Sequence, residues 1–148
     1  MNIYFVCTGN TCRSPIAEAI LRSKMLDNVT VRSAGIHAQN GRPISSNAQT
    51  LIQEVDMPHT PISRAVSSED LEWADLILTM TGAHRSILLD MYPKVGMKTF
   101  TLKEFVRPDS KGDVLDPFGG NLKTYRRTFD ELQELIEVLE QKLVEGKE

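Results

Sequence analysis

The chain has 148 residues and a formal net charge of −3, with acidic and basic residues mixed along its length. A chain of this length is expected to form one domain, residues 1–148, that buries a core without disulfides. No basic cluster marks a nucleic-acid or membrane surface, and no apolar run approaches the roughly 18 residues of a membrane span, so neither partner is expected.

The first predicted element is a buried strand over residues 3–6, Ile-Tyr-Phe-Val. It starts so near the first residue that no signal peptide fits before it, which favours a cytoplasmic protein. The chain's two cysteines, Cys7 and Cys12, follow it within one short loop. This placement argues against a secreted disulfide framework and favours catalytic or redox-active thiols.

The loop after this strand reads Cys7-Thr-Gly-Asn-Thr-Cys-Arg13 and leads into a helix predicted to start at Ser14-Pro15. Backbone N–H groups in such a strand-to-helix turn point inward, and the helix dipole adds positive potential, so an anion is favoured. The same field and the Arg13 charge should lower the pKa of Cys7 and produce the nucleophilic thiolate. We therefore predict a phosphate-binding loop, and the residues expected to contact phosphate are Thr8, Gly9, Asn10, Thr11, Cys12, Arg13 and Ser14.

Three loop residues suit this geometry. Gly9 allows close backbone approach, Asn10 tolerates the left-handed conformation, and Ser14 can cap the helix or donate a hydrogen bond to the sulfur. In the alternative interpretation Cys7 is a small buried hydrophobe and Arg13 a surface charge, which leaves the strand-loop-helix context unexplained.

Strand and helix signals alternate along the rest of the chain. Further strands are predicted over residues 29–34, 76–80 and 99–102. Helices are predicted from Ser14 to about Met25, over 45–55, from Ser67 through Trp73, between Thr81 and Pro93, and over 122–143, with polar loops over 37–43, 57–65 and 107–120.

This alternation predicts an α/β fold: a single-domain, doubly wound sheet of four parallel strands with helices on both faces. We expect the flavodoxin-like strand order 2-1-3-4. Ligands in such folds bind outside the carboxyl ends of the strands, which is where the phosphate-binding loop follows the first strand.

A second motif, Asp116-Pro117-Phe118, lies shortly before the last predicted helix. Together with the Cys-x5-Arg-Ser loop it closely resembles the low-molecular-weight protein tyrosine phosphatases, over essentially the whole chain. Thr11 and Phe118 look most like the bacterial branch that removes phosphate from arginine in proteins. The resemblance implies the same flavodoxin-like fold, no cofactor, and phosphorylated proteins as substrates of a monomer, with an opposing protein-arginine kinase.

Phosphoryl transfer needs an in-line nucleophile, charge stabilisation and a proton for the leaving group. Cys7 would form a cysteinyl-phosphate, the loop amides and Arg13 would hold the oxygens, and Asp116 would act as general acid and then base. The alternative for Asp116 is a turn former in Asp-Pro-Phe-Gly-Gly. Asp113 is a rival acid, which we rank below Asp116 because its surroundings suggest a solvated side chain.

Thr11 and Phe118 are candidates for substrate recognition. A Thr11 hydroxyl can accept a hydrogen bond from the N–H groups beside phosphorus in phosphoarginine, where tyrosine-directed relatives usually carry an aliphatic residue. Its alternative is a local bond to the backbone. Phe118 is either a wall of the substrate cleft or a partly buried loop anchor.

Other functions use the same loop. A protein tyrosine phosphatase is the main alternative; an arsenate reductase would need cysteines beyond Cys12, and a non-catalytic anion-binding or redox-sensing module needs only the loop. The loop lacks the Gly-Lys-Ser/Thr end of a nucleotide-binding P-loop.

Further polar residues receive mainly structural interpretations. Ser33 and Ser46 could bond the loop, but strand-end and capping roles are favoured. His37, His59 and His84 have no metal spacing, so surface or loop positions and no metal site are expected. Because Cys7 and Cys12 share the loop, Cys12 is predicted to capture an oxidised Cys7 as a disulfide.

Overall fold

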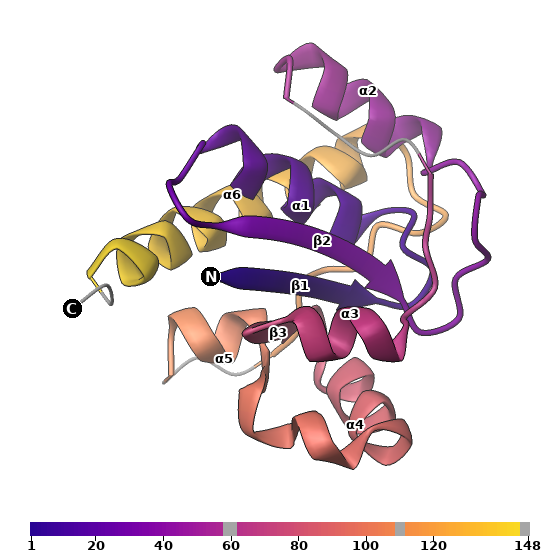
Figure 1. Cartoon of the computed structure of the whole chain (residues 1–148). Helices are drawn as coiled ribbons and strands as arrows, with labels where there is room; N and C mark the ends of the chain where they lie inside the picture. The colour runs from indigo at the N-terminus through magenta and orange to yellow at the C-terminus, as the bar shows by residue number, and fades with distance from the viewer. Residues whose placement is uncertain (58–61, 109–111, 146–148) are drawn as a thin grey trace.

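The computed structural model describes residues 1–57, 62–108 and 112–145, with no side-chain description at 145. Four parallel strands form one sheet in the order β2-β1-β3-β4 (Figure 1). They span Asn2–Cys7 (β1), Thr30–Gly35 (β2), Leu76–Thr79 (β3) and Thr99–Thr101 (β4). The predicted strand order and parallel sheet are confirmed.

Helices cover both faces of the sheet, as predicted. Figure 1 shows α1 (Arg13–Ser23), α2 (Ser46–Glu54) and α6 (Leu122–Glu145) on one side, and α3 (Ser68–Trp73) and α4 (Gly82–Met91) on the other. Strand β1 contributes to the hydrophobic cores on both faces of the sheet, because successive side chains of a strand point to opposite faces. Ile3 and Phe5 belong to one core, and Tyr4 and Val6 belong to the other.

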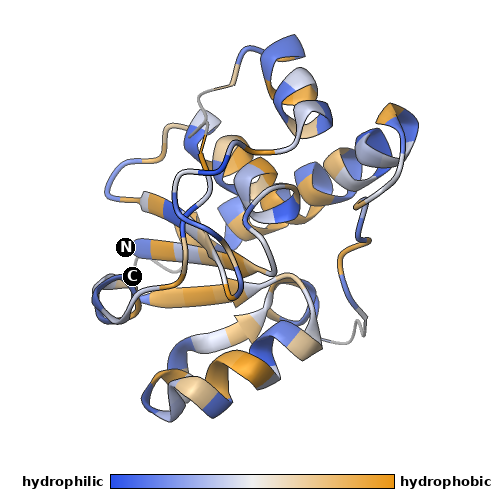
Figure 2. Ribbon diagram, turned by 90° about the vertical axis from the view of Figure 1, so that its right-hand side faces the viewer, coloured by the Kyte–Doolittle hydropathy of each residue, from blue (hydrophilic) through white to orange (hydrophobic). Residues whose placement is uncertain are grey.

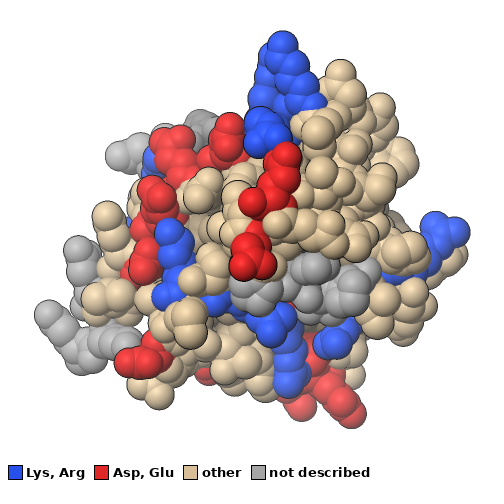
Figure 3. Space-filling view, turned by 90° about the horizontal axis from the view of Figure 1, so that it is seen from above, with Lys and Arg blue, Asp and Glu red and all other residues tan. Residues whose placement is uncertain are grey.

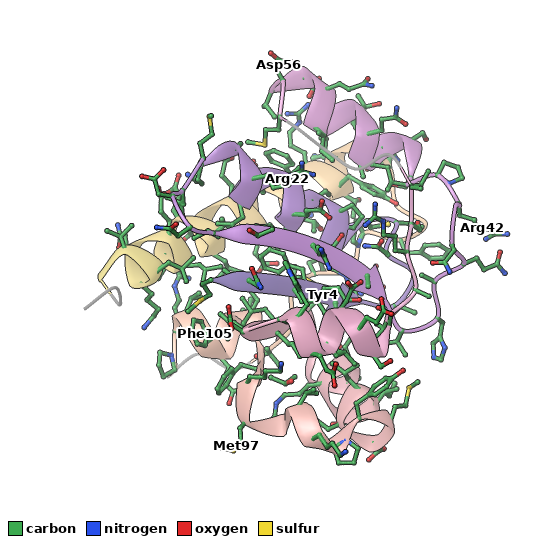
Figure 4. The ribbon with its side chains drawn as sticks, in the orientation of Figure 1. Tyr4, Arg22, Arg42, Asp56, Met97 and Phe105 are labelled. Atoms are coloured by element: carbon green, nitrogen blue, oxygen red, sulfur yellow. The ribbon has the colours of Figure 1, made fainter. Side chains whose placement is uncertain are left out.

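The hydropathy colouring in Figure 2 shows the same arrangement, with apolar strands between helices that carry both apolar and polar residues. Helix α6 buries an apolar stripe on one face, formed by Tyr125, Phe129, Leu132, Leu135, Ile136 and Leu139. In Figure 4, Tyr4 lies between the sheet and α3, where its hydroxyl contacts Asp70. None of the helices in the described ranges is long and apolar enough to cross a membrane.

Two short elements were not predicted. The 3₁₀ helix η1 (Pro93–Lys98) starts at a proline, and α5 (Leu102–Val106) follows β4 directly. Thr101 ends the strand because its side chain accepts a hydrogen bond from the Glu104 amide and caps α5. The predicted strand end at 102 is therefore wrong by one residue.

The sequence pattern also misplaced some apolar side chains. Met25 was predicted to end the first helix, but α1 ends at Ser23, and Met25 is exposed with φ at +51°. Met91 and Leu122 are apolar residues within the helices predicted between Thr81 and Pro93 and over 122–143, and both lie at exposed positions. In the predicted loop over 57–65, residues 58–61 lie outside the described ranges.

Candidate active site

Strand β1 ends at Cys7, and α1 begins at Arg13, so residues 8–12 form a tight loop at the carboxyl edge of the sheet. Its floor is closed by Gly35, the last residue of β2. A Cβ at this position would lie 2.5 Å from the Thr8 carbonyl oxygen and 2.7 Å from the Asn10 nitrogen. The loop can therefore pack on β2 only because residue 35 has no side chain.

A cavity of about 230 Å³ opens above this loop. Its lining unites most of the predicted site residues: Cys7, Thr8, Gly9, Thr11, Cys12, Arg13, Asp116 and Phe118. Asn10 and Ser14, which were also predicted to bind phosphate, are buried outside this lining and support the loop from behind. The thiol, the guanidinium and the carboxylate thus share one small chamber.

Cys7 is surrounded by hydrogen-bond donors. The Ser14 hydroxyl lies 2.8 Å from its sulfur, and the Asn10 amide donates to the sulfur at 3.2 Å. Burial nevertheless raises the pKa of the Cys7 thiol, and the bonds from Ser14 and Asn10 and the Arg13 charge offset only part of this effect. The predicted lowering of this pKa is therefore wrong.

Ser14 serves the sulfur and does not cap the helix. The N-cap of α1 is Cys12, which makes no capping bond through its side chain, and the helix starts at Arg13 instead of Ser14. Of the two roles that the sequence left open for Ser14, the structure shows the hydrogen bond to Cys7.

Asn10 connects the loop to three parts of the chain. It has φ at +54°, and its side-chain amide donates to Ser14 at 2.8 Å and to Ser33 at 2.9 Å. Its side-chain oxygen Oδ1 accepts a hydrogen bond from the Arg64 backbone amide at 2.8 Å, and the Ser33 hydroxyl donates to the buried Glu18 at 2.6 Å. The strand-end role favoured for Ser33 is incomplete, because Ser33 also braces the loop.

The capping role favoured for Ser46, and the contact with the loop considered for it, are found at the neighbouring Ser45. The Ser45 backbone amide donates to the Thr11 carbonyl at 2.9 Å, and the Ser45 side chain caps α2. Ser46 is the first residue of the helix. Sequence spacing could not separate the two adjacent serines.

Asp116 lies on the rim of the cavity. One carboxylate oxygen lies 3.6 Å from an Arg13 guanidinium nitrogen, and the other accepts a hydrogen bond from the Phe118 amide at 3.0 Å. Arg13 is buried and donates to the Val114 carbonyl at 3.0 Å. Asp116 is therefore both a turn residue and an acid that faces the cavity, and the 80% exposed Phe118 extends along its edge.

The rival acid Asp113 is absent from the lining of this cavity. It lies in a neighbouring groove, where one of its oxygens accepts a hydrogen bond from the Gly82 amide at 2.9 Å. Its expected position in solvent is thus only partly correct, because the side chain fixes the start of α4.

His84 contradicts the sequence expectation. It is only 6% exposed, and its Nε2 lies 2.7 Å from the Thr8 hydroxyl. Burial, aided by the Arg13 charge, lowers the pKa of His84 to about 4. Its place in the first turn of a helix that follows a parallel strand could have indicated this position; His37 is exposed, and His59 lies outside the described residues.

Cys12 has a partner from the far end of the chain. Its sulfur lies 3.2 Å from the hydroxyl of Tyr125, on α6. Burial and this bond raise the pKa of Tyr125. The sequence analysis placed Tyr125 only within the predicted helix over 122–143.

Neither the surface charges nor the arrangement of metal-ligating side chains indicates a further ligand. On the face drawn in Figure 3, basic and acidic side chains are interspersed. Within the described ranges, no three His, Cys, Asp or Glu side chains come together in a way that could hold a metal ion.

Comparison with known proteins places the site in context. The family model described as low molecular weight phosphotyrosine protein phosphatase matches residues 2–148. A protein-arginine-phosphatase of Geobacillus stearothermophilus is 43% identical over 141 residues, 95% of each chain. The low molecular weight protein-tyrosine-phosphatase PtpB of Staphylococcus haemolyticus is 43% identical over 136 residues, 92% of this chain and 95% of that protein.

A solved structure gives chemical detail. The YwlE arginine phosphatase, as a Cys-to-Ser mutant with a phosphorylated active site serine, superposes with a TM-score of 0.94 at 42% identity. The match covers 99% of this chain and 98% of that chain. One of these relatives is named for arginine and the other for tyrosine, and both are 43% identical to this chain, so the choice between the two substrates depends on the residues of the cavity.

Proposed function

The chain belongs to the low molecular weight phosphotyrosine protein phosphatase family, and we propose that it hydrolyses phosphoarginine in proteins through a cysteinyl-phosphate intermediate. The observation that carries this proposal is the joint lining of one cavity by Cys7, Arg13, Asp116 and the polar Thr11. The relatives named protein-arginine-phosphatase and the phosphorylated serine in the YwlE mutant support it.

In the first step the Cys7 sulfur attacks phosphorus, and the bond from phosphorus to the guanidinium nitrogen breaks. Because burial raises the pKa of the thiol, we expect its proton to move to an oxygen of the bound phosphoryl group, which leaves the total charge in the cavity unchanged. Asp116 donates a proton to the leaving nitrogen, so arginine departs in its ordinary protonated form.

In the second step water attacks phosphorus and the sulfur–phosphorus bond breaks. Asp116, now a carboxylate, accepts a proton from the water, the Cys7 sulfur takes back the proton that the phosphoryl oxygen held, and inorganic phosphate leaves. The loop amides and the Arg13 guanidinium hold the phosphoryl oxygens in both steps. Arg13 is pre-positioned for this by its bond to the Val114 carbonyl.

The experiment that tests this function compares kcat/KM for one peptide sequence carrying either phosphoarginine or phosphotyrosine. We expect a higher kcat/KM for phosphoarginine, and no turnover of either peptide by Cys7→Ser. A preference for phosphotyrosine would replace the proposal by the tyrosine phosphatase function, for which the PtpB relatives are the precedent. Absence of turnover by the unmodified protein would leave a non-catalytic anion-binding module.

A further inference from the structure

A groove of about 450 Å³ adjoins the Cys7 cavity, and the two share Thr8, Arg13 and Asp116 in their linings. His84 and Asp113 line the groove only. A substrate whose phosphoryl group lies beside Cys7 can extend into this groove past the three residues that line both the cavity and the groove. The part of the substrate that enters the groove is the leaving group, because the proposed acid Asp116 lines the groove and must reach the nitrogen that joins the leaving group to phosphorus.

Thr8 is exposed on this shared rim, yet its hydroxyl is tied to a buried residue. His84 Nε2 lies 2.7 Å from Thr8 Oγ1, and the other ring nitrogen, Nδ1, is buried with no hydrogen-bond partner among the described residues. A proton on Nδ1 would therefore be a buried, unpaired donor, which is the more costly arrangement. We assign the proton to Nε2, so that His84 donates to Thr8.

This assignment fixes what Thr8 offers to a substrate. A threonine hydroxyl has one proton and two acceptor lone pairs, and His84 occupies one lone pair. The second lone pair remains for a donor in the cavity or groove. The carboxylates of Asp113 and Asp116 in the groove favour a positively charged group there, while Arg13 is turned to Asp116 and the Val114 carbonyl.

We infer that Thr8, oriented by His84, is a specificity determinant that accepts a hydrogen bond from an N–H of the guanidinium leaving group. This inference rests on the proposed function and adds a second acceptor to Thr11. Phosphotyrosine has no N–H beside its bridging oxygen, so it gains nothing from Thr8. His84 acts through Thr8 and is a positioning residue.

The test measures kcat/KM on the paired phosphoarginine and phosphotyrosine peptides for four variants: Thr8→Val, His84→Leu, His84→Gln and the double variant Thr8→Val/His84→Leu. Thr8→Val is expected to lower the phosphoarginine-to-phosphotyrosine ratio by about 10-fold, the usual effect of one lost hydrogen bond to substrate. His84→Leu should lower the ratio in the same direction. His84→Gln retains an N–H donor near Thr8 and should restore most of it.

The double variant separates positioning from packing. If both residues act through the same hydroxyl, the double variant has the ratio of Thr8→Val alone, whereas independent structural effects would multiply. His37→Leu is the matched control, because His37 is exposed and touches Thr8 through its backbone amide. The ratio should not change in this control.

Two results would overturn the inference. One is an unchanged ratio in Thr8→Val, which removes the hydroxyl with little change of side-chain volume at an exposed position. The other is an equal loss on both peptides, which would make Thr8 and His84 general supports of the loop. Failure of the proposed function itself appears separately, in the substrate preference of the unmodified protein.

Discussion

At the scale of single residues, the cavity lining includes two side chains, Thr11 and Asp116, that can accept hydrogen bonds from a guanidinium group. Thr11 is half-buried in the cavity wall, its hydroxyl 3.6 Å from the Cys12 sulfur, a long contact that leaves the oxygen available to a substrate. On the opposite side Asp116 is 57% exposed, so a bound leaving group can reach it.

We predict that Thr11→Ile lowers kcat/KM for phosphoarginine peptides by about 10-fold or more, because the guanidinium N–H groups lose an acceptor and are buried against a methyl group. Activity on the matching phosphotyrosine peptide should hold or rise. Steady-state kinetics on the peptide pair measure both. A proportional loss on the two substrates would show that Thr11 supports the loop and does not select the substrate.

Asp116→Asn should slow turnover in proportion to the basicity of the leaving group. The loss should be small for para-nitrophenyl phosphate, whose leaving group needs little protonation, and large for phosphoarginine. Asp90→Asn is the matched control, because Asp90 is exposed on α4 and lines neither the Cys7 cavity nor the adjoining groove. Equal losses on the two substrates would argue against Asp116 as the acid.

At the scale of elements, the loop between β1 and α1 depends on its contacts with β2. Gly35→Ala should place a methyl group against the Thr8 carbonyl and the Asn10 amide, which must then move. We expect a destabilisation of about 1–3 kcal/mol, as in other overpacked sites, together with reduced kcat on every substrate.

Denaturant unfolding and kinetics on para-nitrophenyl phosphate measure these two effects of Gly35→Ala. Gly82→Ala is the matched control, because a Cβ at position 82 meets no atom within 4 Å. Unchanged stability and kcat in Gly35→Ala would mean that the loop can retreat from β2 without cost.

The two cysteines of this loop also predict a redox response. Peroxide should inactivate the enzyme through a Cys7–Cys12 disulfide. The rate of inactivation should rise with pH, because the thiolate is the form that reacts with peroxide and burial raises the pKa of Cys7. Cys12→Ser should hydrolyse substrate almost normally but recover poorly in dithiothreitol. Equal recovery of both proteins would argue against Cys12 as the resolving thiol.

At the scale of the whole molecule, His84 couples folding to pH. Its pKa is about 4 in the folded protein and about 6.5 when unfolded, so the unfolded state binds more protons between these values. Its contribution to stability is complete above pH 6.5 and is lost as the pH falls toward 4. The free energy of unfolding should fall by about 2–3 kcal/mol over this range through His84 alone.

Chemical denaturation at several pH values measures this loss for the unmodified protein and for His84→Gln, which cannot titrate. The difference between the two curves isolates the contribution of His84 from those of all other titratable groups. Parallel curves would contradict the buried, neutral state of His84.

Patterns within short stretches of the sequence were enough to predict the sheet and the phosphate-binding loop. The run of buried residues in β1, the spacing from Cys7 to Arg13 and the alternation of strands and helices indicated the sheet order and the phosphate loop, because these depend on near neighbours and on short, right-handed connections. The sequence also selected Asp116 over Asp113, helped by its resemblance to a family.

The tertiary structure alone decided which distant side chains meet. His84 reaches Thr8 across 76 positions and Tyr125 reaches Cys12 across 113. The place of His84 after a parallel strand indicates the edge of the sheet at which it lies but not its partner, and Tyr125 carries no local signal of its contact. The pKa of Cys7 was misjudged for the same reason. Loop donors and the Arg13 charge can be read from neighbouring residues, but the burial that outweighs them depends on every element packed around the sulfur.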